Sequence, residues 1–352
     1  MAASTLAEVA KLAGVSPATA SRVLNGSARK PGEDIAERVR NAAVSLGYIP
    51  NAQAQALARS SSGLIGLVVH DIADPYFSAI ARGVQEVARE QRRMVLLAST
   101  GGTPEEEREA VAAFAARRAD SIVIAGTRST QAGHASANKE LAAELDRYCR
   151  NGGHVAVVGQ GVVGAKETEG YHVVAVPNEE LSRRLALDLA AIHIGQFWII
   201  AGPEGLATSD ERTKGFQRGL EAAGRPAAEV LRTSFNREGG YKAGGKLASR
   251  IQALYKADPN AAKPCIFAVN DVMAIGAAAA LREKGIRIPN GAAIAGFDDI
   301  ETLRDFRPAL STVRLPLEEI GRLATRSTAG EDVGRTLEVT GEVALRRSTE
   351  KG

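Results

Sequence analysis

From residue 63 onward the sequence alternates short runs of valine, isoleucine and leucine with longer amphipathic stretches. The apolar runs show no polar alternation, so both faces of each strand must be buried, as in parallel sheets covered by helices. The expected strands are 64–69, 94–99, 121–126, 154–159, 172–176, 197–202, 265–270 and 292–297. The expected helices are 78–91, 105–118, 180–191, 212–223, 240–254 and 272–284. This many strands favour two doubly wound lobes over a single sheet, with the polar stretches 127–140 and 327–341 as surface loops.

Residues 1–60 follow a different pattern, typical of a small helical domain. Thr5 and Glu8 form a capping box, Gly14 ends the first helix, and Ser16 followed by Pro17 begins a second. A third helix is expected at 33–46. Two short helices joined by a glycine-containing turn form a helix-turn-helix, whose second helix fits the major groove of DNA. An ordinary helical hairpin in a small bundle is the alternative.

The charge distribution supports the DNA interpretation. Residues 1–60 hold seven basic and four acidic side chains, an excess equal to the net charge of +3 of the whole chain. A positive excess confined to one end is typical of a nucleic-acid-binding headpiece, although a solvated surface would also account for it.

The stretch 52–59 is rich in alanine and too short to be helical alone in water, where about 12–15 residues are marginal. We expect it to order against a partner. Leu57, which has few apolar neighbours in sequence, could then act as a wedge between base steps in a minor groove. A flexible linker is the alternative.

The segments TLAEVAKLAGVSPATASRVLNG (5–26) and LGYIPNAQAQALARSSSGLIGLVV (46–69) resemble the headpiece and hinge of the lactose-repressor/galactose-repressor (LacI/GalR) family of bacterial transcription regulators. The resemblance implies that Pro17, Ala18 and Arg22 face base edges, with Arg22 donating to guanine, and that Leu57 enters the minor groove of a palindromic operator. The residues expected to contact DNA are Leu6, Ser16, Pro17, Ala18, Ser21, Arg22, Asn25, Asn51, Gln55 and Leu57. The chain departs from the family at 31–36, where we expect Gly32 or Asp34 to cap the third helix.

The later segments HDIADPYFSAIARGVQ (70–85), SDERTKGFQRGLEAAG (209–224) and AGFDDIE (295–301) also match family blocks. The resemblance implies a core like that of periplasmic sugar-binding proteins, with an effector held between two lobes. The expected effector contacts are Asp74, Tyr76, Phe77, Arg212, Phe235, Asn270 and Asp298. Core packing is the alternative for Tyr76 and Phe77, and a loop or helix-cap role for Asp298. The chain departs from the family around 177–181, where Asn178 stands at the expected helix start.

Two glycine motifs suggest nucleotide chemistry but fit poorly. VVGQGVVG (157–164) matches the dinucleotide fingerprint, yet only residues 165–171 precede the next strand, whereas a crossover needs at least about 10–12 residues. Its glycines are therefore expected to form turns beside the cleft. GYKAGGKL (240–247) is one residue short of a phosphate-binding loop and has Leu247 where a hydroxyl is needed. The five histidines lack metal-ligand spacing, so we expect no catalytic residues, no metal and no cofactor.

The sequence therefore predicts a DNA-binding transcription regulator, expected to be a repressor, that binds a palindromic operator as a homodimer or a higher assembly. A small effector, a sugar or a derivative, would control it. The expected domains are 1–49, a hinge at 50–62 and a core at 63–352, with lobe one at 63–176 plus 299–312 and lobe two at 177–298 plus 313–352. A solute-binding protein without a role on DNA and a nucleotide-dependent α/β enzyme are the alternatives. No membrane span or export signal is recognisable and only two cysteines occur, which favours the cytoplasm, on the nucleoid when bound.

Overall fold

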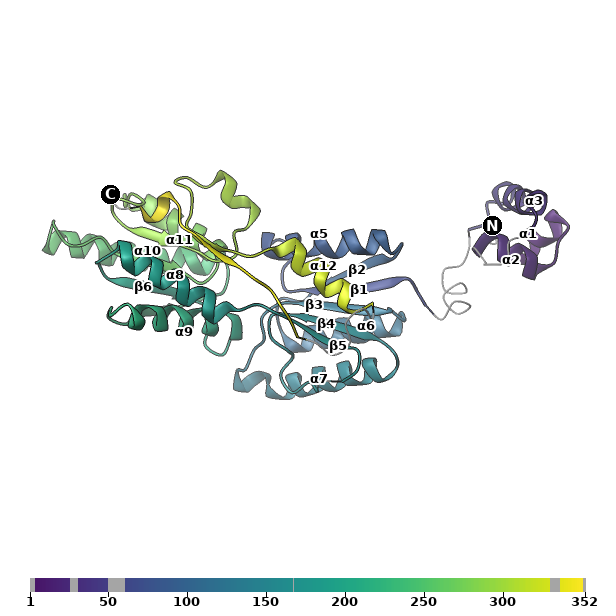
Figure 1. The fold of residues 1–352 in the computed structure, drawn as a ribbon, viewed down its shortest axis with the longest axis horizontal. Helices are drawn as coiled ribbons and strands as arrows, with labels where there is room; N and C mark the ends of the chain where they lie inside the picture. Colours follow the sequence, from purple (N-terminus) through teal and green to yellow (C-terminus); the bar gives the residue numbers. More distant parts are fainter. Residues whose placement is uncertain (1–3, 26–30, 50–60, 167, 330–335, 351–352) are drawn as a thin grey trace. The chain divides into compact units, whose positions relative to one another are not determined.

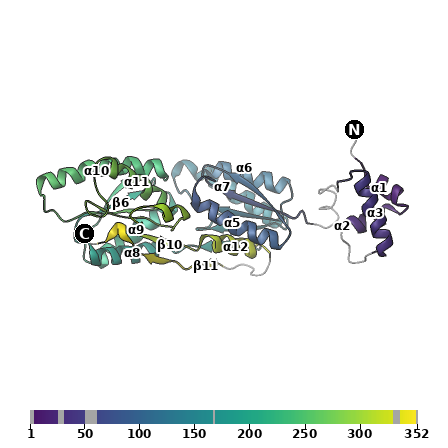
Figure 2. The same cartoon turned by 90° about the horizontal axis from the view of Figure 1, so that it is seen from above.

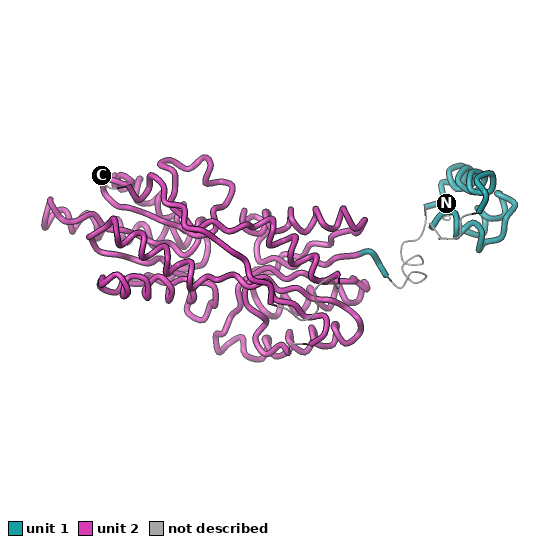
Figure 3. Tube along the Cα trace, viewed as in Figure 1, with its two compact units in different colours: residues 1–63 teal, residues 64–352 magenta. Residues whose placement is uncertain are grey.

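The computed structural model describes residues 4–25, 31–49, 61–166, 168–329 and 336–350. The chain divides into two compact units, residues 1–63 and residues 64–352 (Figure 3). The predicted hinge at 50–62 lies largely outside the described residues. In the described parts, no helix is long and apolar enough to cross a membrane.

The first unit is the predicted bundle of α1 (Leu6–Ala13), α2 (Pro17–Asn25) and α3 (Glu33–Ser45). The capping box is confirmed, because the Thr5 hydroxyl accepts from the Glu8 amide at 3.3 Å and the Glu8 carboxylate accepts from the Thr5 amide at 2.7 Å. Gly14 ends α1 in the left-handed conformation, with a φ of 66°. Gly32 occupies the cap position of α3 without a side-chain hydrogen bond. A core of small apolar side chains joins the helices: Val9, Ala10, Ala13, Ala20, Val39, Ala42 and Ala43.

The second unit contains two parallel sheets, each at the centre of one lobe (Figure 1). The lobe-one sheet has the order β11-β5-β4-β3-β1-β2. Its strands are β1 (Leu64–Val69), β2 (Met94–Ser99), β3 (Ser121–Ala125), β4 (His154–Val158), β5 (Tyr171–Ala175) and β11 (Thr336–Glu338). The lobe-two sheet has the order β7-β6-β8-β9. Its strands are β6 (Phe197–Ala201), β7 (Glu229–Arg232), β8 (Cys265–Ala268) and β9 (Ala293–Ala295).

Helices cover both faces of each sheet, which explains why the strands lack polar alternation. In lobe one, α5 (Pro75–Glu90) and α12 (Leu317–Ser327) cover one face, and α6 (Pro104–Ala116) and α7 (Ala135–Arg150) cover the other. Successive residues of β3 therefore face different cores: Val123 lies in the cluster that contains Ile80, and Ile124 in the cluster that contains Phe114.

Lobe two has the same layered design. The pair α8 (Asn178–Ile192) and α9 (Ala207–Ala222) packs on one face of its sheet, opposite the pair α10 (Arg237–Ala257) and α11 (Asp271–Glu283) (Figure 2). The predicted fold class, a helix-turn-helix headpiece followed by a two-lobed parallel α/β core, is confirmed.

The predicted division of the C-terminal residues between the lobes was wrong. The chain leaves lobe two through β10 (Thr312–Arg314), adds α12 and β11 to lobe one, and returns through β12 (Glu342–Ala344) (Figures 1 and 2). Residues before β10 stay with lobe two, because Ser311 bridges to Ala295. The elements α12 and β11 belong to lobe one, since α12 packs on α5 and β11 pairs with β5. The apolar face of α12 in the sequence predicts a helix that packs on a sheet, but it does not distinguish between the sheets of the two lobes.

Two predicted loops also proved to be structured. Within 127–140, Thr127, Arg128 and Ser129 are buried, a short 3₁₀ turn spans Ala132–His134, and α7 begins at Ala135. Within the described part of 327–341, Ser327 is the last residue of α12, Thr328 follows it, and both are buried. The strand β11 forms an edge of the lobe-one sheet. Polar composition was misleading because the polar groups of 127–131 bind distant partners such as Glu107 and Gly205, and the Ser327 and Thr328 hydroxyls bind carbonyls of α12.

Adjacent glycines in α10 offer a matched pair of substitutions. A Cβ added to Gly244 would lie 2.6 Å from the Ala277 Cα in α11, whereas one on Gly245 would meet nothing within 4 Å. We expect Gly244→Ala to lower the free energy of unfolding by about 1–3 kcal/mol through overpacking. Gly245→Ala should raise it by about 0.5–1 kcal/mol, because alanine is the better helix former. Urea denaturation measures both, and equal changes would contradict a close helix contact at Gly244.

Candidate functional site

The predicted DNA-contacting residues divide between the surface and the core of the headpiece. Pro17, Ala18 and Arg22 lie exposed on α2. Ser21 and Asn25 are half-buried on the same helix, and the Asn25 amide donates to the Ser21 hydroxyl at 2.9 Å. These side chains form a surface of small residues with one exposed guanidinium, of a size that a groove of DNA accepts.

The remaining predicted contacts are placed differently. The Ser16 hydroxyl accepts from the Thr19 amide at 3.1 Å, so it caps α2. Leu6 is half-buried against the headpiece core. Asn51, Gln55 and Leu57 lie outside the described residues. The DNA-binding role of all these residues stays a prediction.

The core unit has a cavity of about 510 Å³ between the lobes, at the carboxyl ends of the strands of both sheets. Ligands of open parallel α/β sheets bind at this edge. All the predicted effector contacts line the cavity: Asp74, Tyr76, Phe77, Arg212, Phe235, Asn270 and Asp298. Asn178 lines it too, although the sequence around it departs from the family pattern. The structure thus gathers residues that are more than two hundred positions apart in the chain.

Arg212, on α9, is the centre of the polar network in the cavity wall. Its Nε donates to the Asn178 side-chain oxygen at 2.9 Å and its Nη1 to the Val269 carbonyl at 2.8 Å. Its Nη2 lies 2.9 Å from the Asp298 carboxylate. The guanidinium also stacks 3.8 Å above the Phe297 ring. Arg212 is only 2% exposed, so this network is buried in the wall of the cavity.

The carboxylates of the cavity are strongly affected by burial. Burial raises the pKa of Asp298 to about 7, although the neighbouring Arg212 acts to lower it. Burial also raises the pKa of Asp74, whose carboxylate caps α5 by accepting from the Tyr76 amide at 2.9 Å. Asp298 has a φ of 118°, a conformation that most side chains avoid, and this aims its carboxylate at Arg212. Asp298 therefore acts in the cavity wall and not as a helix cap.

Aromatic side chains form the apolar part of the cavity. Tyr76 and Phe77 meet edge to face with their ring centroids 5.0 Å apart, and Phe77 also contacts the ring of His70 at 5.7 Å. Phe77 is 9% exposed and belongs to the lobe-one core as well. Phe235 packs against Gly202, where an added Cβ would lie 2.9 Å from the Phe235 ring. These rings can stack on a flat ligand face such as a sugar ring.

Sequence reasoning missed the contribution of His70 and its partners. The His70 Nε2 lies 3.1 Å from the Glu107 carboxylate, which accepts from both terminal nitrogens of Arg128 at 2.6 and 2.9 Å. Burial alone would raise the pKa of Glu107, but Arg128 and His70 outweigh it, so this pKa is lowered. Only the position of His70 directly after the first apolar run could have signalled its place at the cavity.

Other lining residues escaped prediction because they are small or unremarkable in sequence. They come from the ends of strands and from helix starts: Asp71, Ser99, Gly101, Gly102, Gly126, Thr127, Val158, Val176, Leu206, Thr208 and Asn236. Gly126 is required there, since an added Cβ would lie 2.0 Å from the His70 ring.

Of the glycines in VVGQGVVG, Gly159 lines the cavity, with a φ of 92°. β4 ends at Val158 and β5 begins at Tyr171, and the described residues between them contain no helix. The expected turn role beside the cleft is therefore confirmed for Gly159. The second glycine motif, at 240–247, lies inside α10, where its glycines allow close packing on α11. In the described residues no group of acidic, histidine or cysteine side chains is arranged to hold a metal ion.

Two polar contacts lie beside the cavity, and the first of them joins the lobes directly. The first, which we call the lobe clasp, joins residues 127–131 to residues 204–208. Ser129 bridges to Leu206, the Thr130 amide donates to the Gly205 carbonyl at 2.7 Å, and the Thr208 amide donates to the Thr127 hydroxyl at 3.0 Å. Thr127 and Thr208 also line the cavity, so the clasp and the ligand space share a wall.

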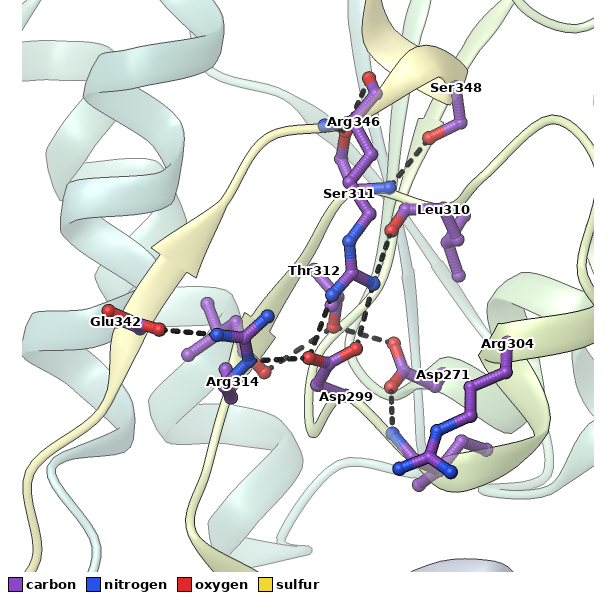
Figure 4. Close-up of polar contacts among 12 residues, drawn as sticks. Asp271, Asp299, Arg304, Leu310, Ser311, Thr312, Arg314, Glu342, Arg346 and Ser348 are labelled. Atoms are coloured by element: carbon purple, nitrogen blue, oxygen red, sulfur yellow. Dashed lines mark hydrogen bonds and ion pairs between the residues drawn. The ribbon is translucent and has the colours of Figure 1, made fainter.

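The second contact lies where the chain crosses between the lobes (Figure 4). Asp299 accepts from Arg346 at 2.7 and 2.8 Å and from Arg314 at 2.8 Å, and Arg314 also binds Glu342 of β12 at 2.7 Å. Burial alone would raise the pKa of Asp299, but the two arginines outweigh it and lower this pKa. Because Asp299 follows Asp298 directly, the ion pair between Asp299 and Arg314 connects the cavity wall to the crossover segments.

Comparison with known proteins gives a consistent result for both units. Residues 5–51 match the model of "Bacterial regulatory proteins, lacI family", and residues 188–349 match "Periplasmic binding protein-like domain". The chain is 31% identical to the HTH-type transcriptional regulator GalS of Salmonella typhimurium, over 96% of this chain and 92% of GalS.

Solved structures show the same fold. A lac repressor dimer bound to operator and an anti-inducer superposes with a TM-score of 0.78 at 22% identity, covering 99% of this chain and 100% of that one. A LacI-family regulator from Enterococcus faecium with bound ribose superposes with a TM-score of 0.65 at 23% identity, covering 82% of this chain and 98% of that one.

Proposed function

This chain belongs to the lacI family of bacterial regulatory proteins, and from that premise we propose that it represses transcription by binding a palindromic operator as a homodimer. It is a helix-turn-helix transcription regulator with a periplasmic-binding-protein-like core. It binds DNA in the cytoplasm, on the nucleoid. A small effector in the cavity between the lobes alters its affinity for DNA, a coupling typically worth about 1–3 kcal/mol.

The observation that carries the proposal is the exposed face of α2, where Pro17, Ala18 and Arg22 stand on the second helix of a helix-turn-helix. This helix enters the major groove, and Arg22 donates two hydrogen bonds to a guanine. The Leu57 side chain enters the minor groove at the centre of the operator, between the two half-sites.

We propose a sugar or a sugar derivative as the effector. The aromatic rings of Tyr76, Phe77 and Phe235 offer faces for a sugar ring, and the polar groups of Asp74, Asn270 and Asp298 offer partners for its hydroxyls. The sugar bound to the related regulator from Enterococcus faecium supports this choice.

The edge of the lobe-one sheet supports a dimer. β2 is an edge strand of this sheet, and it exposes 64% of Met94 and 47% of Leu97. Apolar side chains on an open edge strand invite pairing with another surface. A second copy of the chain covers this edge, and the two headpieces then reach successive major grooves.

Replacing Arg22 by alanine tests the proposal. A palindrome selected from random DNA by the full-length protein serves as the probe in a band-shift titration. We expect Arg22→Ala to weaken binding by about 1–3 kcal/mol and to relax the preference at one base of each half-site, because a bidentate contact is lost.

Arg40→Ala is the matched control, because Arg40 is also exposed but lies on α3 and pairs with Glu33. It should leave the base preference unchanged. Wild-type binding should weaken steeply as salt rises. A protein lacking residues 1–60 that bound the palindrome as tightly as the full chain would refute the proposal.

A further inference from the structure

The ionisable side chains that line the cavity between the lobes are predominantly acidic. Asp71, Asp74 and Asp298 contribute carboxylates, whereas Arg212 and His70 are the basic side chains among the lining residues of the described structure. No lysine is among them. An anionic ligand would therefore meet more negative than positive side chains.

Arg212 is already bound by groups of the protein itself. Each of its three nitrogens already has an oxygen acceptor within 2.9 Å, namely Asn178, Val269 and Asp298. One face of its guanidinium is covered by the ring of Phe297. The His70 ring is also engaged, because its Nε2 lies against the carboxylate of Glu107.

Acidic side chains also lie at the positive ends of two nearby helices, α5 and α9. The Asp74 carboxylate caps α5, and Asp210 in the first turn of α9 accepts from the Gly205 amide at 2.8 Å. Asp271, at the start of α11, is fully buried and accepts from the Ile300 amide at 3.0 Å (Figure 4). The partial positive charge that would attract a phosphate at the starts of α5 and α9 thus already has a carboxylate beside it.

We propose that the cavity takes an uncharged polyol and excludes phosphorylated sugars and sugar acids. The carboxylates of Asp74 and Asp298 accept from ligand hydroxyls, and the aromatic rings pack on the carbon skeleton. A phosphate would lose its hydration without gaining a free cation, which is unfavourable in a buried site. This inference rests on the proposed function only in taking the cavity as the effector site.

Thermal melting of the full-length protein with matched ligands tests the inference. The probes are ribose, glucose, galactose and uridine, each beside its monophosphate, together with glucuronate and galacturonate, all at the same millimolar concentration. At least one neutral compound should raise the Tm by several degrees, since the stabilisation by a ligand grows with the logarithm of its concentration divided by its Kd. Its charged partner should bind about a hundredfold more weakly and leave the Tm within error.

Asp298→Asn makes the test sharper. Asparagine keeps the shape of the side chain and tolerates a positive φ, but it removes the negative charge beside the Arg212 Nη2. The variant should bind the phosphorylated compound at least about tenfold more tightly than the wild type does. Asp299→Asn is the matched control: it removes the adjacent carboxylate, which faces Arg314 and Arg346, and should not change the charge preference.

The wild-type measurements decide the question even if Asp298→Asn does not fold. A phosphate or uronate that shifts the Tm as much as its neutral parent would overturn the inference, and so would a panel in which no neutral compound shifts it. Neither result involves DNA, so a failure here is distinguishable from a failure of the band-shift experiment.

Discussion

Replacing Arg212 by alanine should lower the free energy of unfolding at pH 8 by about 3–5 kcal/mol, because it leaves the buried Asp298 carboxylate without its partner. Asp298 is 4% exposed and has its counter-charge in the Arg212 guanidinium. The substitution also removes the hydrogen bonds that the Asn178 side-chain oxygen and the Val269 carbonyl accept from Arg212. Urea denaturation of wild type and variant measures the difference. Arg212 thus supports the fold of lobe two as well as the wall of the cavity.

The size of this effect should depend on pH in a predictable direction. Burial raises the pKa of Asp298 to about 7, so the folded protein binds a proton that the unfolded chain releases above its ordinary carboxyl pKa. Stability from this group is therefore full at low pH and declines as pH rises through about 7. Without Arg212 the pKa rises further, so the loss caused by Arg212→Ala should be larger at pH 8 than at pH 5.5.

Arg218→Ala is the control for this prediction, because Arg218 lies on the same helix, is 55% exposed and pairs with Glu179 at the surface. An exposed pair contributes at most about 1 kcal/mol, so this variant should remain close to wild type at both pH values. If Arg212→Ala were no more destabilising than Arg218→Ala, or if its effect did not vary with pH, the ion pair in the cavity floor would be refuted.

Replacing Arg128 by methionine should lower the free energy of unfolding by about 3–5 kcal/mol for a similar reason. Glu107 is 2% exposed and Arg128 4% exposed, and two hydrogen bonds join them. Methionine fills much of the same space but leaves the Glu107 carboxylate with only His70 beside it. The backbone carbonyl of residue 128 accepts from the Ala207 amide, which lies in the lobe clasp. Loss of the ion pair that holds residue 128 should therefore make the clasp more mobile, and hydrogen exchange at 204–208 would detect this.

A double substitution separates the charge from the packing. Glu107→Leu combined with Arg128→Met removes both charges, and it should be less destabilising than Arg128→Met alone, because no buried charge is left unpaired. Arg150→Met is the surface control, since Arg150 is 69% exposed and pairs with Asp146 on α7. A double variant that is less stable than the single one would show that the pair stabilises the fold by its geometry and not merely by mutual neutralisation.

Most strands and helices could be predicted because their local patterns are strong. The runs at 64–69 and 94–99 became β1 and β2 with the same bounds, since long apolar runs flanked by helices have few other solutions. Short elements were missed: β7, β11 and β12 have three or four residues each, too few for a recognisable period. The start of α5 at Pro75 was placed too late, because the cap formed by Asp74 was not recognised.

The cavity shows where sequence reasoning reached its limit. Its predicted residues, such as Tyr76 and Asp298, were found through resemblance to a family, and the structure places them around one cavity. The engagement of Arg212 by Asp298 could not be inferred, because 85 residues separate these two positions, which lie within α9 and beyond the end of β9 and meet only in the folded lobe. The same holds for Glu107, which reads as one of several acidic residues at a helix start yet is fully enclosed.

By itself, the sequence determined the elements of this protein: caps such as Thr5 and Ser16 begin helices, and apolar runs bury strands on both faces, because these effects act over a few neighbouring residues. Only the tertiary structure decided which lobe receives α12 and β11, and which buried carboxylates neutralise Arg212 and Arg128. Those outcomes depend on contacts between segments far apart in the chain. The same contacts decide which acidic and basic side chains meet at the cavity.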